Sequence, residues 1–248
     1  MSLSVIVITK NEARDIRACL ESVKWADEIV VLDSGSTDGT VAICREFTEK
    51  VYETDFPGFG LQKNRALDLA TGDWVLSLDA DERVSDALRD EIAAAMAGPA
   101  KYAAFDIPRL SSYCGKSIRH SGWWPDYVTR LFRRGKARFN EVLVHERLLV
   151  DGPTARFRHP LIHEAFRDLD EVLDKMNSYS SAGARMMKRE KREGSLGRAV
   201  GHGLWSFFHT YVIRLGFLDG REGFMLAVSN AEGTYYRYLK RMLQDRIP

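Results

Sequence analysis

The stretch VLSLDADERV (residues 75–84) decides the fold, because an apolar run ends there in three acids. The run is too short for a core helix and suits a buried strand. Asp79, Asp81 and Glu82 then follow within four positions. Carboxylates this close repel one another and destabilise the fold unless a cation or a proton holds them together. The stretch therefore predicts a buried strand whose carboxyl end carries a charged loop.

Two earlier segments follow the same design of strand, polar loop and helix. The apolar runs SVIVIT (4–9) and EIVVL (28–32) are each followed by polar residues and then by helical spacing of apolar residues. Continuous apolar strands that alternate with helices indicate a parallel sheet covered on both faces. Ligands of such sheets bind beyond the carboxyl ends of the strands, so we expect residues 9–12, 33–38 and 79–82 to meet in one cleft.

The pattern changes after residue 100. The next segments have strand character with Gly and Pro turns and no long helix between them, which predicts antiparallel additions to the sheet. From Leu169 the chain becomes helical and basic. It continues into LWSFFHTYVIRLGFL (204–218), an apolar run with five aromatic residues that falls short of the roughly 20 residues needed to span a bilayer. We therefore expect an α/β domain over 1–168 and a helical region over 169–248.

Composition excludes several classes of function. With 36 Lys and Arg against 35 Asp and Glu, the net charge is +1, which gives no support to nucleic-acid binding. The three cysteines, Cys19, Cys44 and Cys114, have no metal-ligand spacing and suit a reducing compartment. The amino-terminal run has no basic region before it, unlike a signal peptide. These features predict a cytoplasmic protein.

The acids after the strands are the candidate ligands of a cation. Asp79 and Asp81 have no other obvious cation, and together they suit one hard divalent ion whose remaining ligands are phosphate oxygens. The alternative is that these acids cap the helix that begins near Ser85. Asp33 directly follows a strand, where a carboxylate can bind a base or a ribose. Its Gly- and Ser-rich loop also suits a simple turn and helix cap.

Two cations on the helix before the decisive strand are candidate phosphate partners. These two cations are Lys63 and Arg65. Alternatively, they are charges at the protein surface that are solvated by water. The loop before them lacks the Gly-Lys-Ser/Thr spacing of a P-loop, so the sequence does not predict that kind of phosphate site.

Four segments carry a resemblance to a known family. In this order and spacing, VIVITKNEARDI, VVLDSGSTDGT, QKNRAL and LSLDADE resemble the nucleotide-binding half of family 2 glycosyltransferases, inverting enzymes of GT-A fold. The segments GWWPDYVTRLFRRGKARFNEVLVHERLLVDG and GFLDGREGF are similar to the subgroup that contains lipopolysaccharide-core β-1,4-glucosyltransferases.

The resemblance implies a Rossmann-like half over 1–100 that binds a nucleotide sugar and an acceptor half over 101–168, within one mixed sheet. It also implies roles for single residues, which are Thr9, Asn11, Glu12 and Asp33 for the nucleoside, and Asp79 and Asp81 for ribose, metal and diphosphate. A UDP-sugar is the favoured donor. The acceptor is a glycan or a lipid-linked saccharide, in lipopolysaccharide core or other cell-envelope synthesis.

Inverting transfer needs a base for the acceptor hydroxyl and a Lewis acid for the departing nucleoside diphosphate. Mg²⁺ or Mn²⁺ held by Asp81 suits the second role. Glu146 is the favoured base, because it lies roughly where many family members carry a Glu-Asp pair, although here the pair is His145-Glu146. Asp126, between aromatic residues that could stack on a sugar, is the alternative.

Several other side chains have two interpretations. Trp123, Trp124 and Tyr127 suit either an acceptor platform or the core. We expect His120, His159 and His163 to be ordinary surface or core residues, since they lack ligand spacing.

The C-terminal region also has two interpretations. The basic stretch RMMKREKR (185–192) and the apolar run 204–218 suit peripheral attachment to the inner face of the cytoplasmic membrane, or packing against protein.

Three rival functions remain. A polyprenyl-phosphate glycosyltransferase would use a basic pair near the cleft, for which Arg130, Arg133 and Arg134 are candidates. A haloacid-dehalogenase phosphatase is disfavoured, because Arg83 stands where that class has Thr or Val. The third rival, from a different class, is a non-catalytic nucleotide-sugar-binding protein.

Overall fold

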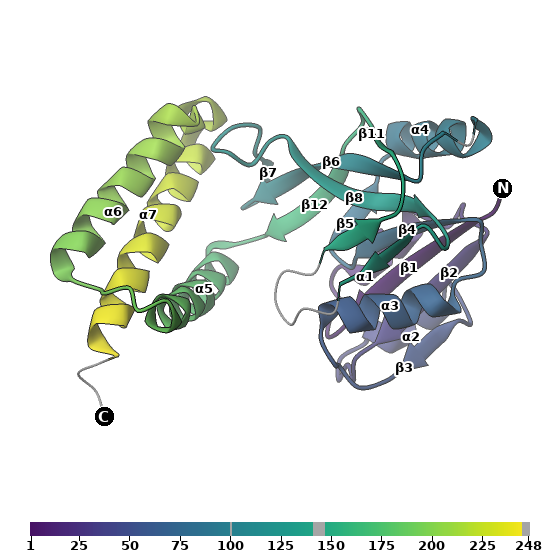
Figure 1. Cartoon of the computed structure of the whole chain (residues 1–248), viewed down its shortest axis with the longest axis horizontal. Helices are drawn as coiled ribbons and strands as arrows, with labels where there is room; N and C mark the ends of the chain where they lie inside the picture. Colours follow the sequence, from purple (N-terminus) through teal and green to yellow (C-terminus); the bar gives the residue numbers. More distant parts are fainter. Residues whose placement is uncertain (100, 141–146, 245–248) are drawn as a thin grey trace. The chain divides into compact units, whose positions relative to one another are not determined.

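The structure is a computed structural model that describes residues 1–99, 101–140 and 147–244. It falls into two compact units (Figure 1). The first unit comprises Met1–Arg109 and Asp126–His163, and the C-terminal unit comprises Leu110–Pro125 and Glu164–Pro248. Strands β6 (Ala104–Tyr113) and β12 (Leu161–Phe166) contribute residues to both units.

The first unit is built on a mixed sheet with the order β3-β2-β1-β4-β8-β6-β12-β5. Strands β3, β2, β1 and β4 run parallel, and β8 joins β4 in the antiparallel direction. The predicted antiparallel additions are thus confirmed for β8. Besides β6 and β12, the strands in this order are β1 (Leu3–Thr9), β2 (Glu28–Asp33), β3 (Val51–Glu53), β4 (Trp74–Asp79), β5 (Glu82–Val84) and β8 (Asp126–Arg133). Strand β11 (Thr154–Arg156) pairs with β6, while β9 (Ala137–Phe139) and β10 (Leu148–Val150) form a separate two-stranded sheet. The helices are α1 (Ile16–Glu21), α2 (Thr40–Arg45), α3 (Phe59–Leu69) and α4 (Asp86–Ala97).

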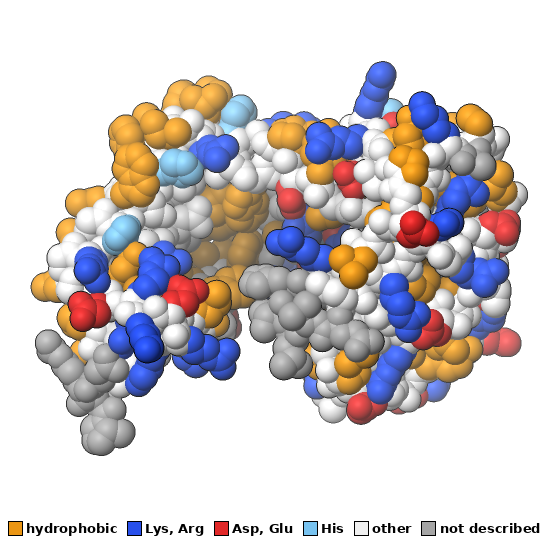
Figure 2. Space-filling model, viewed as in Figure 1, with side chains coloured by type: hydrophobic (Ala, Val, Ile, Leu, Met, Phe, Trp, Pro, Cys, Tyr) orange, Lys and Arg blue, Asp and Glu red, His pale blue; other side chains and the backbone are white. Residues whose placement is uncertain are grey.

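The C-terminal unit is mainly helical, as predicted. After the short strand β7 (Lys116–Ser117) it contains α5 (Leu169–Arg189), α6 (Leu196–Phe208), the π-helical turn η1 (His209–Ile213), the 3₁₀ turn η2 (Gly216–Asp219) and α7 (Gly220–Leu243). Its core includes Tyr113, Ile118, Val172 and Leu226. The space-filling view shows hydrophobic side chains gathered on the outside of this unit along α6 (Figure 2).

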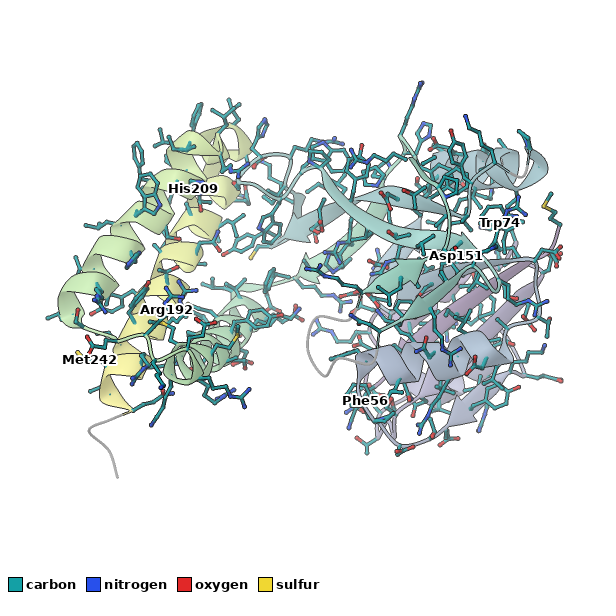
Figure 3. The ribbon with its side chains drawn as sticks, viewed as in Figure 1. Phe56, Trp74, Asp151, Arg192, His209 and Met242 are labelled. Atoms are coloured by element: carbon teal, nitrogen blue, oxygen red, sulfur yellow. The ribbon has the colours of Figure 1, made fainter. Side chains whose placement is uncertain are left out.

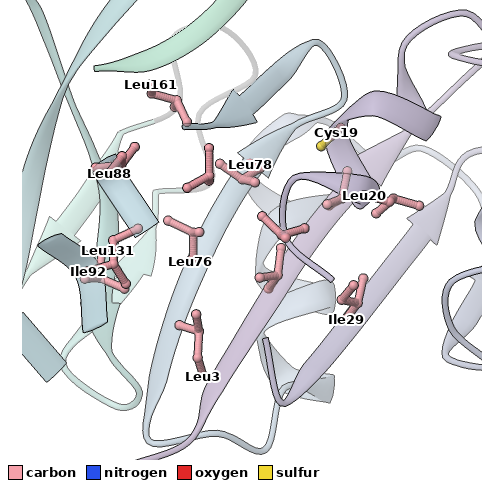
Figure 4. Packing of buried hydrophobic residues seen from close by; sticks show 14 of the residues in the cluster. Leu3, Cys19, Leu20, Ile29, Leu76, Leu78, Leu88, Ile92, Leu131 and Leu161 are labelled. Carbon is pink, nitrogen blue, oxygen red and sulfur yellow. The ribbon is translucent and has the colours of Figure 1, made fainter. Parts of the chain in front are cut away.

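The central strands are apolar throughout because each face of the sheet is covered. Val5 and Val7 of β1 point to one hydrophobic cluster, while Ile6 points to the other. Helices α1, α2 and α4 complete the first cluster, and α3 completes the second. Trp74, labelled in Figure 3, begins β4 and is fully buried. Figure 4 shows leucine and isoleucine side chains of the first cluster packed between strands and helices. The α/β fold class is therefore confirmed.

Some predictions about organisation remain untested. The functional halves 1–100 and 101–168 stay predictions, as does the assignment of 169–248 to a separate role. The three cysteines are free, as expected, and burial raises the pKa of the Cys44 thiol to about 12. In the part of the chain that the structure describes, no helix is both long and apolar enough to cross a membrane.

Candidate functional site

The carboxyl ends of β1, β2 and β4 lie side by side at one edge of the sheet. In the parallel ladders Thr9 pairs with Asp33, and Ile8 pairs with Asp79. The loops that follow these strands therefore leave the sheet at neighbouring positions. The three polar strand ends are therefore neighbours, as predicted, and their meeting in one cleft stays a prediction.

Asp33 is fully buried and organises the loop after β2. Its Oδ1 accepts hydrogen bonds from the hydroxyls of Thr9 (2.9 Å) and Ser36 (2.5 Å). Its Oδ2 accepts from the backbone N–H groups of Gly35 (2.9 Å) and Ser36 (2.8 Å). Gly35 has a φ of +81°, where glycine is favoured. Asp33 thus anchors its own turn, and its contact with a nucleoside stays a prediction.

Asn11 and Glu12 link the loop after β1 to the loop after β2. The backbone N–H of Asn11 donates to Ser36 Oγ (2.8 Å), and its side-chain Oδ1 accepts from the Thr37 N–H (2.8 Å). The Glu12 N–H donates to Thr40 Oγ1 (2.8 Å). Two predicted nucleoside-binding residues are therefore held in a defined loop pair.

Asp79 is compensated by two cations of the protein itself. Its Oδ1 lies 2.9 Å from Lys63 Nζ on α3, and its Oδ2 accepts from the guanidinium of Arg130 on β8. Arg130 also donates to Glu82 Oε1 at 2.6 Å, and both of these side chains are buried. The expectation that Asp79 has no other cation is therefore wrong. Local sequence patterns do not reveal Lys63 and Arg130 as partners, because both lie in segments distant from Asp79 along the chain.

The pKa values of Asp79 and Glu82, the two acids that share Arg130, are shifted in opposite directions. Burial acts to raise the pKa of Asp79, but the charges of Arg130 and Lys63 outweigh burial and hold this pKa well below its usual value. Burial raises the pKa of Glu82, with Arg130 acting against this rise and the Asp79 charge adding to it. Asp79 therefore carries the more persistent negative charge of the cluster.

Asp81 faces a histidine that sequence reasoning did not select. Asp81 Oδ2 lies 3.3 Å from His163 Nε2, and both side chains remain partly exposed, at 29% and 16%. The antiparallel pairing of β12 with β5 sets His163 opposite Glu82, next to Asp81. The expectation of an ordinary histidine rested on spacing alone, and only this strand pairing reveals the contact.

The Asp81 and His163 pair fits a divalent cation that also binds a ligand. Among the described residues, no group of three or more His, Cys, Asp or Glu side chains could hold a metal ion. The pair offers one carboxylate oxygen and one imidazole nitrogen, a combination that suits Mn²⁺ and leaves positions for oxygens of a bound ligand. The residues therefore fit the cofactor that the sequence predicted.

The two candidate phosphate partners on α3 have different surroundings. Lys63 is buried, contacts Asp79 and lies over the Phe139 ring, with Nζ 5.6 Å from the ring centroid. Arg65 is exposed and donates to Asp55 Oδ1 at 2.8 Å. Lys63 is thus next to the acidic strand end, whereas Arg65 pairs with an acid at the surface. Their contact with phosphate stays a prediction.

Of the two candidate bases, Asp126 and Glu146, the structure describes only Asp126. Asp126 begins β8, and its Oδ2 accepts from Arg109 Nε (3.0 Å) and Nη2 (2.6 Å). Arg109 Nη1 also lies 3.7 Å from Glu82 Oε1, which links Asp126 to the acidic cluster through one guanidinium. Glu146 lies outside the described residues. The choice between the two stays a prediction.

Two of the three candidate platform aromatics, Trp123 and Tyr127, have separate environments. Trp123 stacks on Phe166, with ring centroids 5.9 Å apart, and packs against the core of the C-terminal unit. Tyr127 belongs to the first unit and is covered by the Arg156 guanidinium at 4.4 Å. Trp123 therefore follows the core interpretation.

Comparison with known proteins supports the resemblance seen in the sequence. The model of Glycosyl transferase family 2 matches residues 4–163. An uncharacterized glycosyltransferase of Rickettsia felis is 30% identical over 250 residues, which cover 96% of this chain and 88% of the relative. The lipopolysaccharide core biosynthesis glycosyltransferase LpsC of Rhizobium meliloti is 30% identical over 253 residues, which cover 96% and 90%.

A solved structure extends the likeness to the fold. S. aureus TarS 1-349, solved in complex with UDP, aligns with a TM-score of 0.50 and 16% identity, covering 99% of this chain and 92% of that chain. The fold is thus GT-A-like, a mixed sheet with helices on both faces and a helical C-terminal region. On the family match and the length of the 30% identity, this chain belongs to glycosyl transferase family 2.

Proposed function

We propose that the protein moves a sugar, with inversion, from a nucleotide-sugar donor to a saccharide or lipid-linked acceptor. Family membership supports glycosyl transfer. The similarity to LpsC supports an acceptor of the lipopolysaccharide core or another cell-envelope glycan. A UDP-sugar is the favoured donor. The observation that carries the proposal is the Asp81 and His163 pair beside the converging strand ends.

Each residue at the strand ends has a proposed part in donor binding. Thr9, Asn11, Glu12 and Asp33 form the pocket for the nucleoside, in loops tied by their own hydrogen bonds. Mg²⁺ or Mn²⁺ held by Asp81 and His163 would stabilise the charge on the departing diphosphate. Asp79 keeps the Lys63 ammonium at the strand end, and it stays a candidate ligand for ribose or metal. Lys63 would thereby add a positive charge beside the proposed phosphate position.

The acceptor side needs a carboxylate base. Glu146 is the favoured residue and Asp126 is the alternative, held in position by Arg109. The base takes the proton of the acceptor hydroxyl as its oxygen attacks the anomeric carbon, and the bond to the nucleoside diphosphate breaks on the opposite side. One proton moves to the carboxylate and one pair of electrons leaves with the diphosphate.

The polyprenyl-phosphate alternative loses its main physical argument. Arg130 is buried between Asp79 and Glu82. Arg133 pairs in register with Trp74, at the opposite end of β4 from the acids, and Arg134 Nε donates to the Gly72 carbonyl (2.8 Å). These three arginines therefore do not form a basic pair at the acidic strand ends.

Metal-dependent binding of UDP tests the donor site. Calorimetry should detect UDP binding that strengthens with Mn²⁺, and Asp81→Ala should remove this gain, lowering affinity in Mn²⁺ by at least about tenfold. Asp68→Ala is the matched control, because Asp68 is an exposed acid paired with Arg138. Unchanged metal dependence in Asp81→Ala would overturn the metal assignment.

Turnover separates an enzyme from a non-catalytic binding protein. The wild-type chain is incubated with UDP-, GDP- and TDP-sugars, Mn²⁺ and a core oligosaccharide acceptor. We expect release of nucleoside diphosphate that depends on the acceptor. Donor binding without any release, across all three nucleotides, would favour the non-catalytic alternative.

A further inference from the structure

We propose that the C-terminal unit docks on an anionic lipid bilayer through one exposed apolar surface. This surface, here called the apolar face, comprises Leu204, Trp205, Phe208, Ile213, Phe217 and Leu218 from α6, η1 and η2. The proposal concerns this unit alone and does not depend on the proposed reaction.

The apolar face is exposed over its whole length. Leu204 is 68% exposed, Trp205 57% and Leu218 56%. On the opposite side of α6, Ala199 and Gly203 are buried, and Gly203 lies against the backbone of α7. Helix α6 therefore uses its small residues for packing in the protein and leaves its large apolar residues outside. Apolar patches of this extent are uncommon on monomeric proteins and mark an interaction site.

The end of the α6 and α7 hairpin is held in a defined conformation while its apolar side chains stay exposed. The buried Asp219 carboxylate accepts hydrogen bonds from the backbone N–H groups of Arg119 and His120, both at 3.0 Å. The Ser121 N–H donates to the Arg214 carbonyl (2.8 Å). A flexible tip could fold its apolar residues inward, but these bonds fix Phe217 and Leu218 on the outside.

The charges around the apolar face are complementary to anionic headgroups. The stretch 185–224, which runs from the end of α5 through the apolar face, contains eight Lys and Arg and four Asp and Glu, a net charge of +4, and five of the eight cations, in 185–192, precede α6. Two of these acids, Asp219 and Glu222, are buried. Arg198, Arg214 and Arg221 are exposed and lie within or beside the face in sequence. Figure 3 labels Arg192, in the segment between α5 and α6, and His209, which directly follows α6. Basic residues beside inserted aromatic residues are typical of helices that lie in a bilayer interface.

A bilayer suits these charges better than a second copy of the chain. A two-fold symmetric dimer through the apolar face would place the arginines within and beside the face of both copies at one interface, and like charges gathered at an interface are unfavourable. A membrane span is not the explanation either, since no helix in the described residues is long and apolar enough for it. The unit would lie on the surface, with Trp205 and Phe217 at headgroup depth.

Cosedimentation with vesicles tests the proposal on the full-length protein. The wild type should pellet with phosphatidylcholine vesicles that contain phosphatidylglycerol. Binding should weaken with added salt without vanishing, because salt screens charge and leaves insertion intact. The double substitution Phe217→Ser with Leu218→Ser should lower the partition coefficient by at least about tenfold, because two large apolar side chains no longer leave water on binding.

Two control variants make the result specific. Leu149→Ser with Leu173→Ser removes exposed leucines outside the apolar face and should leave partitioning unchanged. Arg214→Gln should reduce the preference for anionic over neutral vesicles. Thermal unfolding should show unchanged melting temperatures for all variants. The proposal is overturned if the wild type ignores anionic vesicles at low salt. It is also overturned if light scattering shows a dimer that the double substitution dissociates while vesicle binding is absent.

Discussion

At the scale of single residues, two acids one position apart have different surroundings. Asp79 ends β4 and has two protein cations, Lys63 and Arg130. Asp81 lies on the turn beyond the strand, where its neighbour is an imidazole. An ammonium and a guanidinium hold a carboxylate charged, whereas a carboxylate with a histidine can share a metal ion. Asp79 therefore anchors the strand end, and Asp81, paired with His163, is the first candidate of the two for the proposed metal ion.

The identity of the general base can be decided by kinetics. Glu146→Gln should bind donor normally and lose at least about 10²-fold in turnover, because the amide cannot accept the acceptor proton. Asp126→Asn should lose less, through the weakened contact with Arg109. Both variants are compared in donor affinity and in turnover with saturating acceptor. If Asp126→Asn shows the larger loss, the assignment moves to Asp126, and near-normal turnover in both would point to an acceptor that arrives already ionised.

At the scale of elements, Arg130 joins three strands. It extends from β8 to Asp79 at the end of β4 and to Glu82 at the start of β5. Strand β5 has only three residues and otherwise pairs with β12. The guanidinium therefore keeps two carboxylates close together that would otherwise repel one another.

Arg130→Met should strongly destabilise the first unit. Removal of one partner leaves buried carboxylates without a counter-charge, and such changes typically lower the free energy of unfolding by about 3–5 kcal/mol. Denaturant unfolding at neutral pH measures the loss. Arg65→Met is the matched control, since Arg65 forms an exposed pair with Asp55 that is worth about 0–1 kcal/mol. Equal effects of the two substitutions would contradict the assigned role of Arg130.

The contact between η2 and the start of α7 depends on a glycine. A Cβ at Gly223 would lie 1.9 Å from the Gly216 carbonyl oxygen, so Gly223→Ala should destabilise the C-terminal unit by about 1–3 kcal/mol or more. A Cβ at Gly201 of α6 would meet nothing within 4 Å, so Gly201→Ala should stabilise by about 0.5–1 kcal/mol through helix propensity. Thermal unfolding should show a lower melting temperature for Gly223→Ala and a higher one for Gly201→Ala. A higher melting temperature for Gly223→Ala would contradict the close contact between Gly223 and Gly216.

The elements that the sequence predicted well are those with local signals. Continuous apolar runs over 4–9 and 28–32 predicted β1 and β2, and the helix expected to begin near Ser85 is α4. Its cap is Ser85 itself, whose Oγ accepts from the Leu88 N–H at 3.3 Å, and not the acids before it. Strand β5 was missed, because three residues carry no periodicity. The His163 contact was missed for a related reason. It arises from strand pairing between residues about eighty positions apart, which no local spacing encodes.

At the scale of the whole molecule, the candidate site and the apolar face belong to different compact units. The strand ends with Asp33, Asp79 and Asp81 lie in the first unit, and α6 lies in the C-terminal unit. Donor binding and membrane contact can therefore be impaired separately by substitution. Asp81→Ala should leave vesicle binding unchanged, and the Phe217 and Leu218 double substitution should leave UDP binding unchanged.

The stability of the whole chain in acid should depend on Glu28, which links four segments. The Glu28 carboxylate contacts Lys50 and Ser4, and it accepts from the Thr71 N–H (2.8 Å) and hydroxyl (3.0 Å). Burial acts to raise the pKa of Glu28, but these partners outweigh burial and lower the pKa from 4.5 to about 2. A folded-state pKa below the unfolded one stabilises the fold above pH 4.5, and this contribution is lost as the pH falls toward 2.

Glu28→Gln should therefore lower the free energy of unfolding on the order of 3 kcal/mol at pH 7, because one pKa unit corresponds to about 1.4 kcal/mol. The difference from wild type should fall to about half or less near pH 3, because below pH 4.5 the unfolded carboxyl takes up a proton while the folded carboxylate, with its pKa of about 2, stays largely charged. Urea unfolding at pH 7, 5 and 3 measures both values. Glu46→Gln is the control, since Glu46 pairs with Arg17 at the exposed surface and should show a far smaller change. A difference between wild type and Glu28→Gln that stays constant over this range would contradict the lowered pKa and leave packing as the only contribution of Glu28.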